Sequence, residues 1–157
     1  MLSGNPEARR HDRDTAVHIT AREIKDLEQK GLLIPAGRDA WKTRSGLLIA
    51  GRDPEGRTRL GHIMRHGVDS PGRPKHGVFS LTKAGIVELL DEAWRKIRAG
   101  GIAGKERGGT VAYTVKMGRV IGFLGGRMGR ERGHPKLESA RLVVKKDKDA
   151  VITFFPM

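Results

Sequence analysis

The apolar positions in the first third of the chain predict one short helix followed by short extended segments. Thr20-Ala-Arg-Glu23 has the capping-box pattern that opens a helix, and Gly31 provides its end. The apolar runs 32–34 and 46–50 are bounded by Gly and Pro, as is typical of strands or buried turns.

Two more helices are expected in the middle of the chain. Apolar spacing predicts a helix over 58–66 and a longer one that starts after Ser80 or Thr82 and runs to about Ala99. The connection 67–77 is rich in Pro and Gly, and this composition indicates a loop.

After residue 109 the period changes from helical to strictly alternating. Thr110–Met117 and 120–124 are predicted strands, 125–133 is a Gly- and Arg-rich loop, and 139–145 with 150–155 form an antiparallel hairpin. Helices followed by antiparallel strands predict an α+β fold in which N-terminal helices pack on a C-terminal antiparallel β-sheet.

Length and composition limit the possible organisation. The chain of 157 residues suits a single domain over 18–157, preceded by a flexible arm or linker over 1–17. No apolar run reaches the roughly 18 to 20 residues of a membrane span, so we expect no stable membrane insertion. The polar start does not resemble a secretory signal, and the absence of cysteine excludes disulfides and a thiol nucleophile.

The charge balance points to nucleic acid. Lys and Arg number 31 against 18 Asp and Glu, which leaves a net charge of +13. Aromatic residues make up only 4% of the chain, so contacts to phosphates are expected to matter more than base stacking.

The segment Arg59-Leu-Gly-His-Ile-Met-Arg-His66 carries the main candidate chemistry. On a helix His62 and His66 are four residues apart and therefore project from one face. Metal-free RNA cleavage needs a base, an acid and a cation that stabilises the phosphorane. The two histidines can supply the base and the acid, and Arg59 or Arg65 the cation. The alternative is a histidine pair that only decorates the surface or packs in the core.

The same His-x3-His spacing also occurs in zinc sites. The metalloprotease pattern requires Glu directly after the first His, but Ile63 occupies that position, and no third ligand stands at a suggestive spacing. Zinc hydrolysis is thus a minor alternative, and we expect neither a metal nor a cofactor.

Other polar residues are candidate substrate contacts. Lys75 and His76 precede the long helix, where a histidine either contacts a phosphate or is simply a solvated loop residue. A polar sheet face opposite the helices would meet the substrate, although such a face is often only solvated. Its candidate residues are Thr114, Lys116, Arg119, Arg141 and Thr153.

The order of four short motifs resembles a known family. These are Leu60-Gly-His-Ile-Met-Arg-His-Gly67, Gly77-Val-Phe-Ser80, Tyr113-Thr-Val-Lys-Met-Gly-Arg-Val-Ile-Gly122 and Val151-Ile-Thr-Phe-Phe-Pro156. They resemble the C-terminal ribonuclease toxin domains of bacterial contact-dependent inhibition and polymorphic toxin systems, in the barnase/EndoU/colicin/RelE-like superfamily. The resemblance covers 58–157.

The resemblance implies a strongly curved antiparallel sheet with the active site in its cleft, and metal-independent cleavage of RNA, with tRNA as the expected substrate. It places His62 and His66 on the histidine-bearing helix, Thr153 as a hydroxyl residue of the last strand, and Arg141 as a phosphate contact. It also implies delivery from the cell surface or by secretion as part of a larger toxin, action in the cytoplasm of the target cell, and a dedicated immunity protein.

The sequence therefore supports two hypotheses of different classes. The first is an RNA endonuclease toxin, monomeric except in complex with its immunity protein, which the +13 charge predicts to be acidic. The second is a non-catalytic RNA- or DNA-binding protein, such as a ribosome-associated factor.

Overall fold

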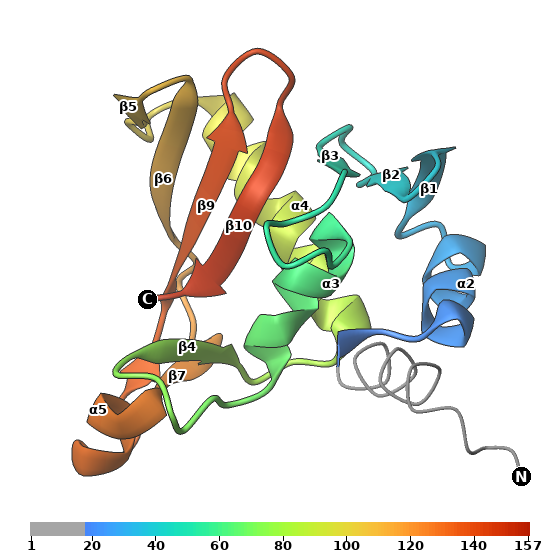
Figure 1. Ribbon diagram of the computed structural model, residues 1–157. Helices are drawn as coiled ribbons and strands as arrows, with labels where there is room; N and C mark the ends of the chain where they lie inside the picture. Colours follow the sequence, from blue (N-terminus) through green and yellow to red (C-terminus); the bar gives the residue numbers. More distant parts are fainter. Residues whose placement is uncertain (1–17) are drawn as a thin grey trace, which may run out of the picture.

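The computed structural model describes residues 18–157, and they form an α+β fold (Figure 1). A seven-stranded sheet has the order β1-β2-β3-β10-β9-β6-β5, and a three-stranded sheet has the order β4-β7-β8. The helical elements are α2 (Ala21–Gln29), α3 (Arg59–Met64), the 3-10 helix η1 (Arg65–Gly67), α4 (Lys83–Ala99) and α5 (Gly126–Glu131). The strands are β1 (Ile34–Gly37), β2 (Ala40–Lys42), β3 (Leu48–Ala50), β4 (His76–Phe79), β5 (Lys105–Arg107), β6 (Thr110–Lys116), β7 (Gly122–Gly125), β8 (Lys136–Leu137), β9 (Ser139–Lys145) and β10 (Ala150–Pro156). The predicted fold class is confirmed; the predicted arm 1–17 lies outside the described residues.

Helices α2 and α4 begin and end where their capping residues predict. The Thr20 hydroxyl accepts the N–H of Glu23 while the Glu23 carboxylate accepts the N–H of Thr20, so the capping box before α2 is complete. Helix α4 starts after Thr82, whose side chain caps it, and ends at Gly100 with φ of 93°. Local sequence was therefore sufficient to define these two helices.

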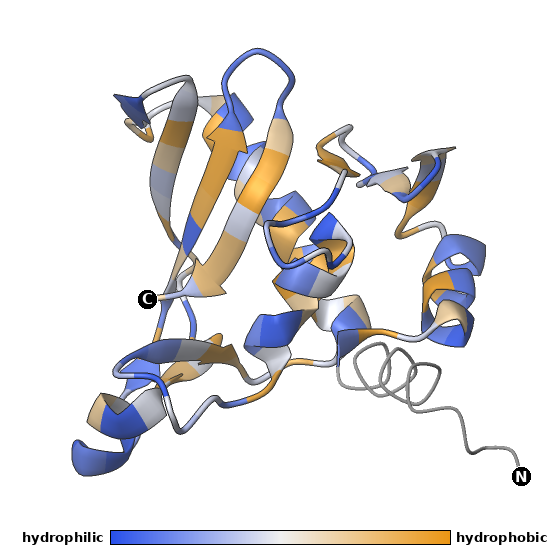
Figure 2. Cartoon of the chain, viewed as in Figure 1, coloured by the Kyte–Doolittle hydropathy of each residue, from blue (hydrophilic) through white to orange (hydrophobic). Residues whose placement is uncertain are grey.

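Helix α4 covers one face of the strands β6, β9 and β10. Val115, Leu142 and Phe154, one from each strand, are 0% exposed on that face. In Figure 1 α4 lies behind these strands, and in Figure 2 the strands are largely hydrophobic while the β9–β10 connection is hydrophilic. The side chains that alternate with the buried ones are half-buried or exposed, as the strict alternation of 110–117 predicted. We call this uncovered surface the open face; it carries Thr114, Lys116, Arg141, Thr153 and Phe155.

A β-bulge in β10 decides which of its residues reach the open face. Consecutive residues of β9 pair with Val151 and Thr153, so Ile152 is an extra residue in β10. Since side chains alternate along a strand, the extra residue allows Val151 and Phe154 both to be buried. Thr153 therefore lies on the open face within an otherwise apolar strand.

The glycine-rich segment 125–133 was predicted to be a loop, and that prediction is wrong. Residues Gly126–Glu131 form α5, which follows β7 directly. A Cβ atom at Gly129 would collide with the carbonyl oxygen of Leu124, so the absence of a side chain lets this helix pack on the backbone. The N–H of Arg127 also donates to the carbonyl of Arg73, which ties α5 to the loop before β4.

Two other expectations about strands need correction. Segment 120–124 was predicted to be a strand of a single C-terminal sheet, but β7 pairs with β4 and β8 in a second sheet. The N-terminal part contributes β1, β2 and β3 as well as helices, and β3 pairs in parallel with β10. The large sheet is thus mixed, although its other strand pairs are antiparallel. Within 18–157 no helix is long and apolar enough to cross a membrane.

Candidate active site

Helix α3 carries His62 to the edge of the open face. The Thr58 hydroxyl accepts the N–H of Gly61 and caps the helix, and Leu60, Ile63 and Met64 are buried beneath it. Figure 1 shows α3 beside β10. Because the apolar residues fix one side of this short helix against the core, His62 lies on the side that faces Thr153.

Asp53, His62 and Thr153 form a chain of hydrogen bonds. His62 Nδ1 is 3.0 Å from Asp53 Oδ2, and His62 Nε2 is 3.3 Å from Thr153 Oγ1. An ionised carboxylate only accepts hydrogen bonds, so the proton of neutral His62 resides on Nδ1. Nε2 is then an unprotonated acceptor for the Thr153 hydroxyl.

Asp53 is held ionised at the base of this chain. Burial would raise the pKa of Asp53, but hydrogen bonds from His62 and from the backbone and side chain of Arg57 outweigh it and lower the pKa to about 2. The carboxylate also accepts the N–H of Glu55 in the turn before α3. Asp53 is 6% exposed and its side chain is fully engaged. It therefore fixes the tautomer and the orientation of the His62 ring.

The surroundings keep His62 neutral near neutral pH. Burial lowers the pKa of His62 below its usual value, and the positive charges of Arg65 and Arg59 lower it further, against the opposite effect of Asp53. A neutral imidazole with an unprotonated Nε2 is the form that can accept a proton.

His66 has a different environment from His62. The α-helix ends at Met64 and continues as the 3-10 helix η1, so the predicted uninterrupted helix over 58–66 is only partly confirmed. His66 is 6% exposed, its Nδ1–H donates to the carbonyl of Gly77 over 3.0 Å, and its ring stacks on His76 and Phe155 at centroid distances of 4.6 and 5.3 Å. Burial lowers its pKa to about 3. At neutral pH His66 is therefore uncharged and its one ring proton is already engaged.

His76 is the first residue of β4, so neither its predicted loop position nor a solvated ring is found. It is 3% exposed, and its Nε2–H donates to the carbonyl of Val68 over 2.9 Å. Burial lowers the pKa of His76, so this ring too is neutral. Its Nδ1 is buried without a hydrogen-bond partner and remains an acceptor.

The stacked histidines line a positively charged cavity of about 570 Å³ next to Thr153. Its lining includes the cations Arg65, Arg73, Lys75 and Arg132 and no Asp or Glu side chain. Arg65 is only 15% exposed, and burial together with the charges of Arg73 and Arg57 lowers its pKa. Arg65 also pairs with Glu55 over 3.6 Å, whereas Arg73, Lys75 and Arg132 form no ion pair with a described carboxylate. Cations without such partners repel one another, and a bound phosphate would relieve that repulsion. We call this space the cationic cavity.

The structure gathers some predicted site residues and separates others. His62 and Thr153 are in contact, and Arg65, Lys75, His66 and His76 line the adjoining cationic cavity. Arg59 instead anchors the backbone, because its guanidinium donates to the carbonyls of Ile152 and Arg52 at 2.7 and 3.2 Å.

The remaining predicted contacts lie farther along the sheet. Arg119 forms a bidentate ion pair with Glu92 of α4 at 3.0 and 2.8 Å, so its guanidinium is already occupied. Thr114, Lys116 and Arg141 share the open face and line a second groove beyond β9. Sequence reasoning missed Asp53, Arg73, Arg132 and Phe155. Asp53 could have been noticed only as the first residue of the turn before α3, a position at which Asp usually serves the turn itself.

Comparison of the chain with family models, curated proteins and solved structures found no match. The resemblance to ribonuclease toxins therefore rests on the four sequence motifs alone. Within residues 18–157, no group of three or more His, Cys, Asp or Glu side chains is placed to hold a metal ion.

The buried histidines make the stability of the fold sensitive to acid. Between about pH 6.5 and pH 3 the unfolded chain binds more protons than the native state, because the pKa values of His62, His66 and His76 are all lowered by folding. The free energy of unfolding should thus fall with decreasing pH, by about 1.4 kcal/mol per pH unit for each proton difference. Urea unfolding of the wild type and of His66→Gln between pH 7 and pH 4 measures this. The variant should be less stable at pH 7 and less dependent on pH; parallel curves would contradict the assignment to His66.

Proposed function

We propose that the protein is a metal-independent RNA endonuclease in which His62 takes the proton of the attacking 2′-hydroxyl. The observation that carries this proposal is the Asp53–His62–Thr153 chain beside a cavity whose charged lining side chains are all cations. An oriented neutral imidazole supplies the base, and the cations favour a phosphate as its neighbour.

The reaction follows from this placement. His62 Nε2 takes the proton of the 2′-hydroxyl, and the 2′-oxygen attacks the adjacent phosphorus. The bond from phosphorus to the 5′-oxygen breaks, which leaves a 2′,3′-cyclic phosphate and a 5′-hydroxyl end. Asp53 stabilises the imidazolium that forms, and Arg65 faces the charge that develops on the phosphorane. The Thr153 hydroxyl turns from His62 to a phosphate oxygen when substrate is bound.

Lys75 is the group that protonates the leaving 5′-oxygen in this proposal. The neutral His66 and His76 each have their one ring proton bound to a carbonyl, so neither is a suitable acid. Arginine does not release its proton in proteins. Lys75 is the lining residue that remains with a transferable proton, and it is exposed to the cavity and to solvent.

We further propose that this nuclease is a toxin directed at tRNA in the cytoplasm of a target cell. This part rests on the resemblance of residues 58–157 to toxin domains and on the net charge of +13. An acidic immunity protein would block the cationic cavity by charge complementarity, and its binding would weaken with salt.

Two alternatives have specific support. The high positive charge alone would suit a protein that binds RNA or DNA without cutting it. The order carboxylate–imidazole–hydroxyl is also found in hydrolases that use a hydroxyl nucleophile, which would make Thr153 form a covalent intermediate. The cationic cavity favours phosphate chemistry over acyl transfer.

Replacing His62 tests the proposed function directly. His62→Ala should lower the rate of RNA cleavage by about 10²- to 10⁴-fold, the usual contribution of a general base, while RNA affinity changes little because the cations remain. The folded His66→Gln variant should lose no more than about 10-fold, the equivalent of one hydrogen bond. A gel assay in EDTA measures the cleavage rate of both variants, and mapping of the RNA ends identifies the cleaved bond. Growth of bacteria that express each variant measures toxicity. Binding without any cleavage by the wild type would favour the non-catalytic alternative, and activity abolished by EDTA would show a metal requirement.

A matched pair of variants distinguishes the role of Lys75 as a proton donor from the effect of its positive charge. Lys75→Arg keeps the positive charge but cannot supply the proton, whereas Lys75→Ala loses both. Both variants should lower kcat to a similar extent, by about 10²-fold or more, with Lys75→Arg retaining the KM of the wild type. Steady-state kinetics on a short RNA measure this, and near-normal kcat in Lys75→Arg would show that only the charge is used.

Substitution of Thr153 tests whether its hydroxyl contacts a phosphate or acts as a nucleophile. Thr153→Val preserves the shape and removes the hydroxyl, so the proposed ribonuclease should slow by roughly 10-fold, the equivalent of one lost hydrogen bond. Thr153→Ser should be close to the wild type. A nucleophile role predicts complete loss in Thr153→Val and a covalent adduct visible by mass spectrometry of the wild type; that result would overturn the proposed mechanism.

A further inference from the structure

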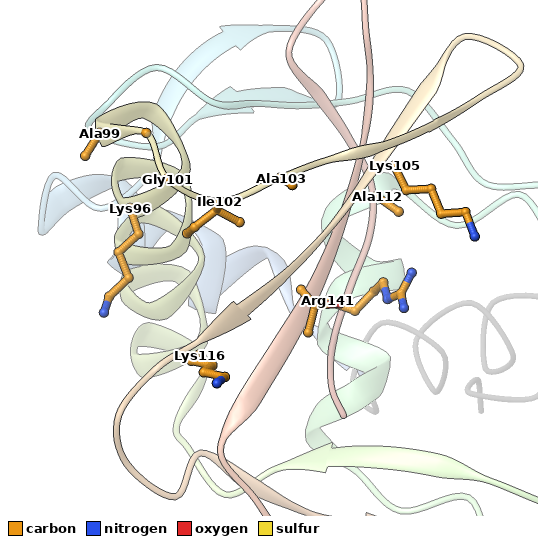
Figure 3. A pocket seen from close by; sticks show the side chains of 11 residues that line it. Lys96, Ala99, Gly101, Ile102, Ala103, Lys105, Ala112, Lys116 and Arg141 are labelled. Atoms are coloured by element: carbon orange, nitrogen blue, oxygen red, sulfur yellow. The ribbon is translucent and has the colours of Figure 1, made fainter.

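The open face continues away from His62 to a second positively charged groove. The groove has a volume of about 660 Å³, which lies within the usual range for ligand pockets of roughly 300–1,000 Å³. Figure 3 shows it between the end of α4, the segment that follows it, and the strands β6 and β9. Lys96, Lys105, Lys116 and Arg141 supply its charge.

The pairing of β5 and β6 explains why a groove forms here. Lys105 pairs with Ala112, and β5 covers β6 only from Thr110 to Ala112. Beyond Ala112 no strand pairs with this edge of β6 within the described chain. The segment from Gly100 to Ala103 passes along the uncovered stretch and closes the groove from the other side (Figure 3).

The described carboxylates make little contact with the cations of this groove. A hydrogen bond from Arg119 and, to a smaller extent, the charge of Lys96 lower the pKa of Glu92, but Lys96 and Glu92 form no ion pair. None of its four cations forms an ion pair with a described carboxylate, and no carboxylate is among the lining residues. Nearby cations behave differently, because Arg119 pairs with Glu92, Arg98 with Asp149 and Lys146 with Glu106. The four groove cations are thus available to an anionic ligand.

The floor between the cations is apolar. Ile102 and Ala112 are half-buried there, beside Ala99 and Ala103. An apolar floor with cations around it suits a nucleotide, whose base and sugar pack on the floor while its phosphates meet ammonium or guanidinium groups.

Strand register connects this groove to the proposed reaction centre. Phe155 of β10, which lines the cationic cavity, is opposite Arg141 of β9, and Arg141 is opposite Thr114 of β6. Neighbouring strands are about 4.8 Å apart, so two steps across the sheet span about 10 Å. Met157 lies between the two spaces, with its sulfur 3.3 Å from Arg141 Nε and 3.9 Å from Thr114 Oγ1.

We propose that the groove lined by Lys96, Lys105, Lys116 and Arg141 is a second subsite for the RNA backbone, and that the substrate is an oligonucleotide extending across the open face from His62 to this groove. The effect of the groove on RNA cleavage rests on the proposed function, whereas the binding of RNA in the groove does not. A dinucleotide would occupy the reaction centre alone, whereas a longer strand would gain the contacts of the groove.

The test uses a double substitution in the groove with a matched control at the other end of the large sheet. Lys96→Ala/Lys105→Ala removes two groove cations, and Lys25→Ala/Lys42→Ala removes two exposed lysines from α2 and β2 while leaving the same net charge. For a single-stranded RNA of about ten nucleotides, a length within the usual range of single-strand sites, the groove variant should raise KM by about 10-fold with kcat retained. Cleavage of a dinucleotide should be unchanged in both variants.

Binding is measured separately on the His62→Ala background by fluorescence anisotropy against salt. Each removed phosphate contact should reduce the slope of log affinity against log salt by roughly 0.7, so the groove variant should lose about 1.4 and the control should lose nothing. If the protein binds RNA in this way but the wild type cuts none, the proposed function fails and the subsite stands.

Three results would overturn the subsite. The groove and control variants could behave alike on the oligonucleotide. The groove variant could lose dinucleotide cleavage to the same extent, which would place these lysines at the reaction centre or in the stability of the fold. A polyglutamate peptide of equal charge could compete as well as RNA, which would assign the groove to an acidic protein partner.

Discussion

The pairing of β10 between β9 and β3 is the constraint on which the rest of the structure depends. The strand is antiparallel to β9 and parallel to β3, so it joins the N-terminal strands to the C-terminal hairpin. Phe154 is 0% exposed and anchors the buried face of β10 in the core. The bulge at Ile152 interrupts the ladder, and the carbonyl of Ile152 is taken by the guanidinium of Arg59. One strand thereby anchors α3, and it presents Thr153 to His62 and Phe155 to His66.

The second sheet is held against the end of the same strand by a close backbone approach. A Cβ atom at Gly77 would collide with the carbonyl oxygen of Pro156, so β4 can pass there only because it has a glycine. The carbonyl of Gly77 then accepts the ring proton of His66. This contact explains why the two histidines of one helical segment differ. His62 meets a carboxylate and a hydroxyl at the edge of the open face, while His66 is fixed as a neutral ring within the packing.

Cations outnumber carboxylates in the proposed site, and their mutual repulsion lowers the stability of the folded state. Asp53 is the described carboxylate in contact with His62, and its other oxygen accepts the backbone N–H groups of Glu55 and Arg57. Of the cations in the cationic cavity and the groove, only Arg65 pairs with a described carboxylate, that of Glu55, and neighbouring like charges repel even in a polar environment. Sites that act on substrates commonly give up stability in this way, since the bound ligand supplies the missing opposite charge. An RNA backbone would do so in both places.

The sequence by itself determined the elements whose information is local. The capping box at Thr20, the cap at Thr82 and the alternation of 110–117 predicted α2, α4 and β6 correctly, because side chains within a few residues satisfy the helix ends and the sheet period. It also predicted the α+β class, and it singled out His62 and Thr153. Only the tertiary structure decided that Asp53 meets His62, that a bulge turns Thr153 outward, and that His66 is buried against β4 and β10. Those outcomes depend on groups 9 to 91 residues apart in the chain, and hydrophobic periodicity carries no information about which distant residues will meet.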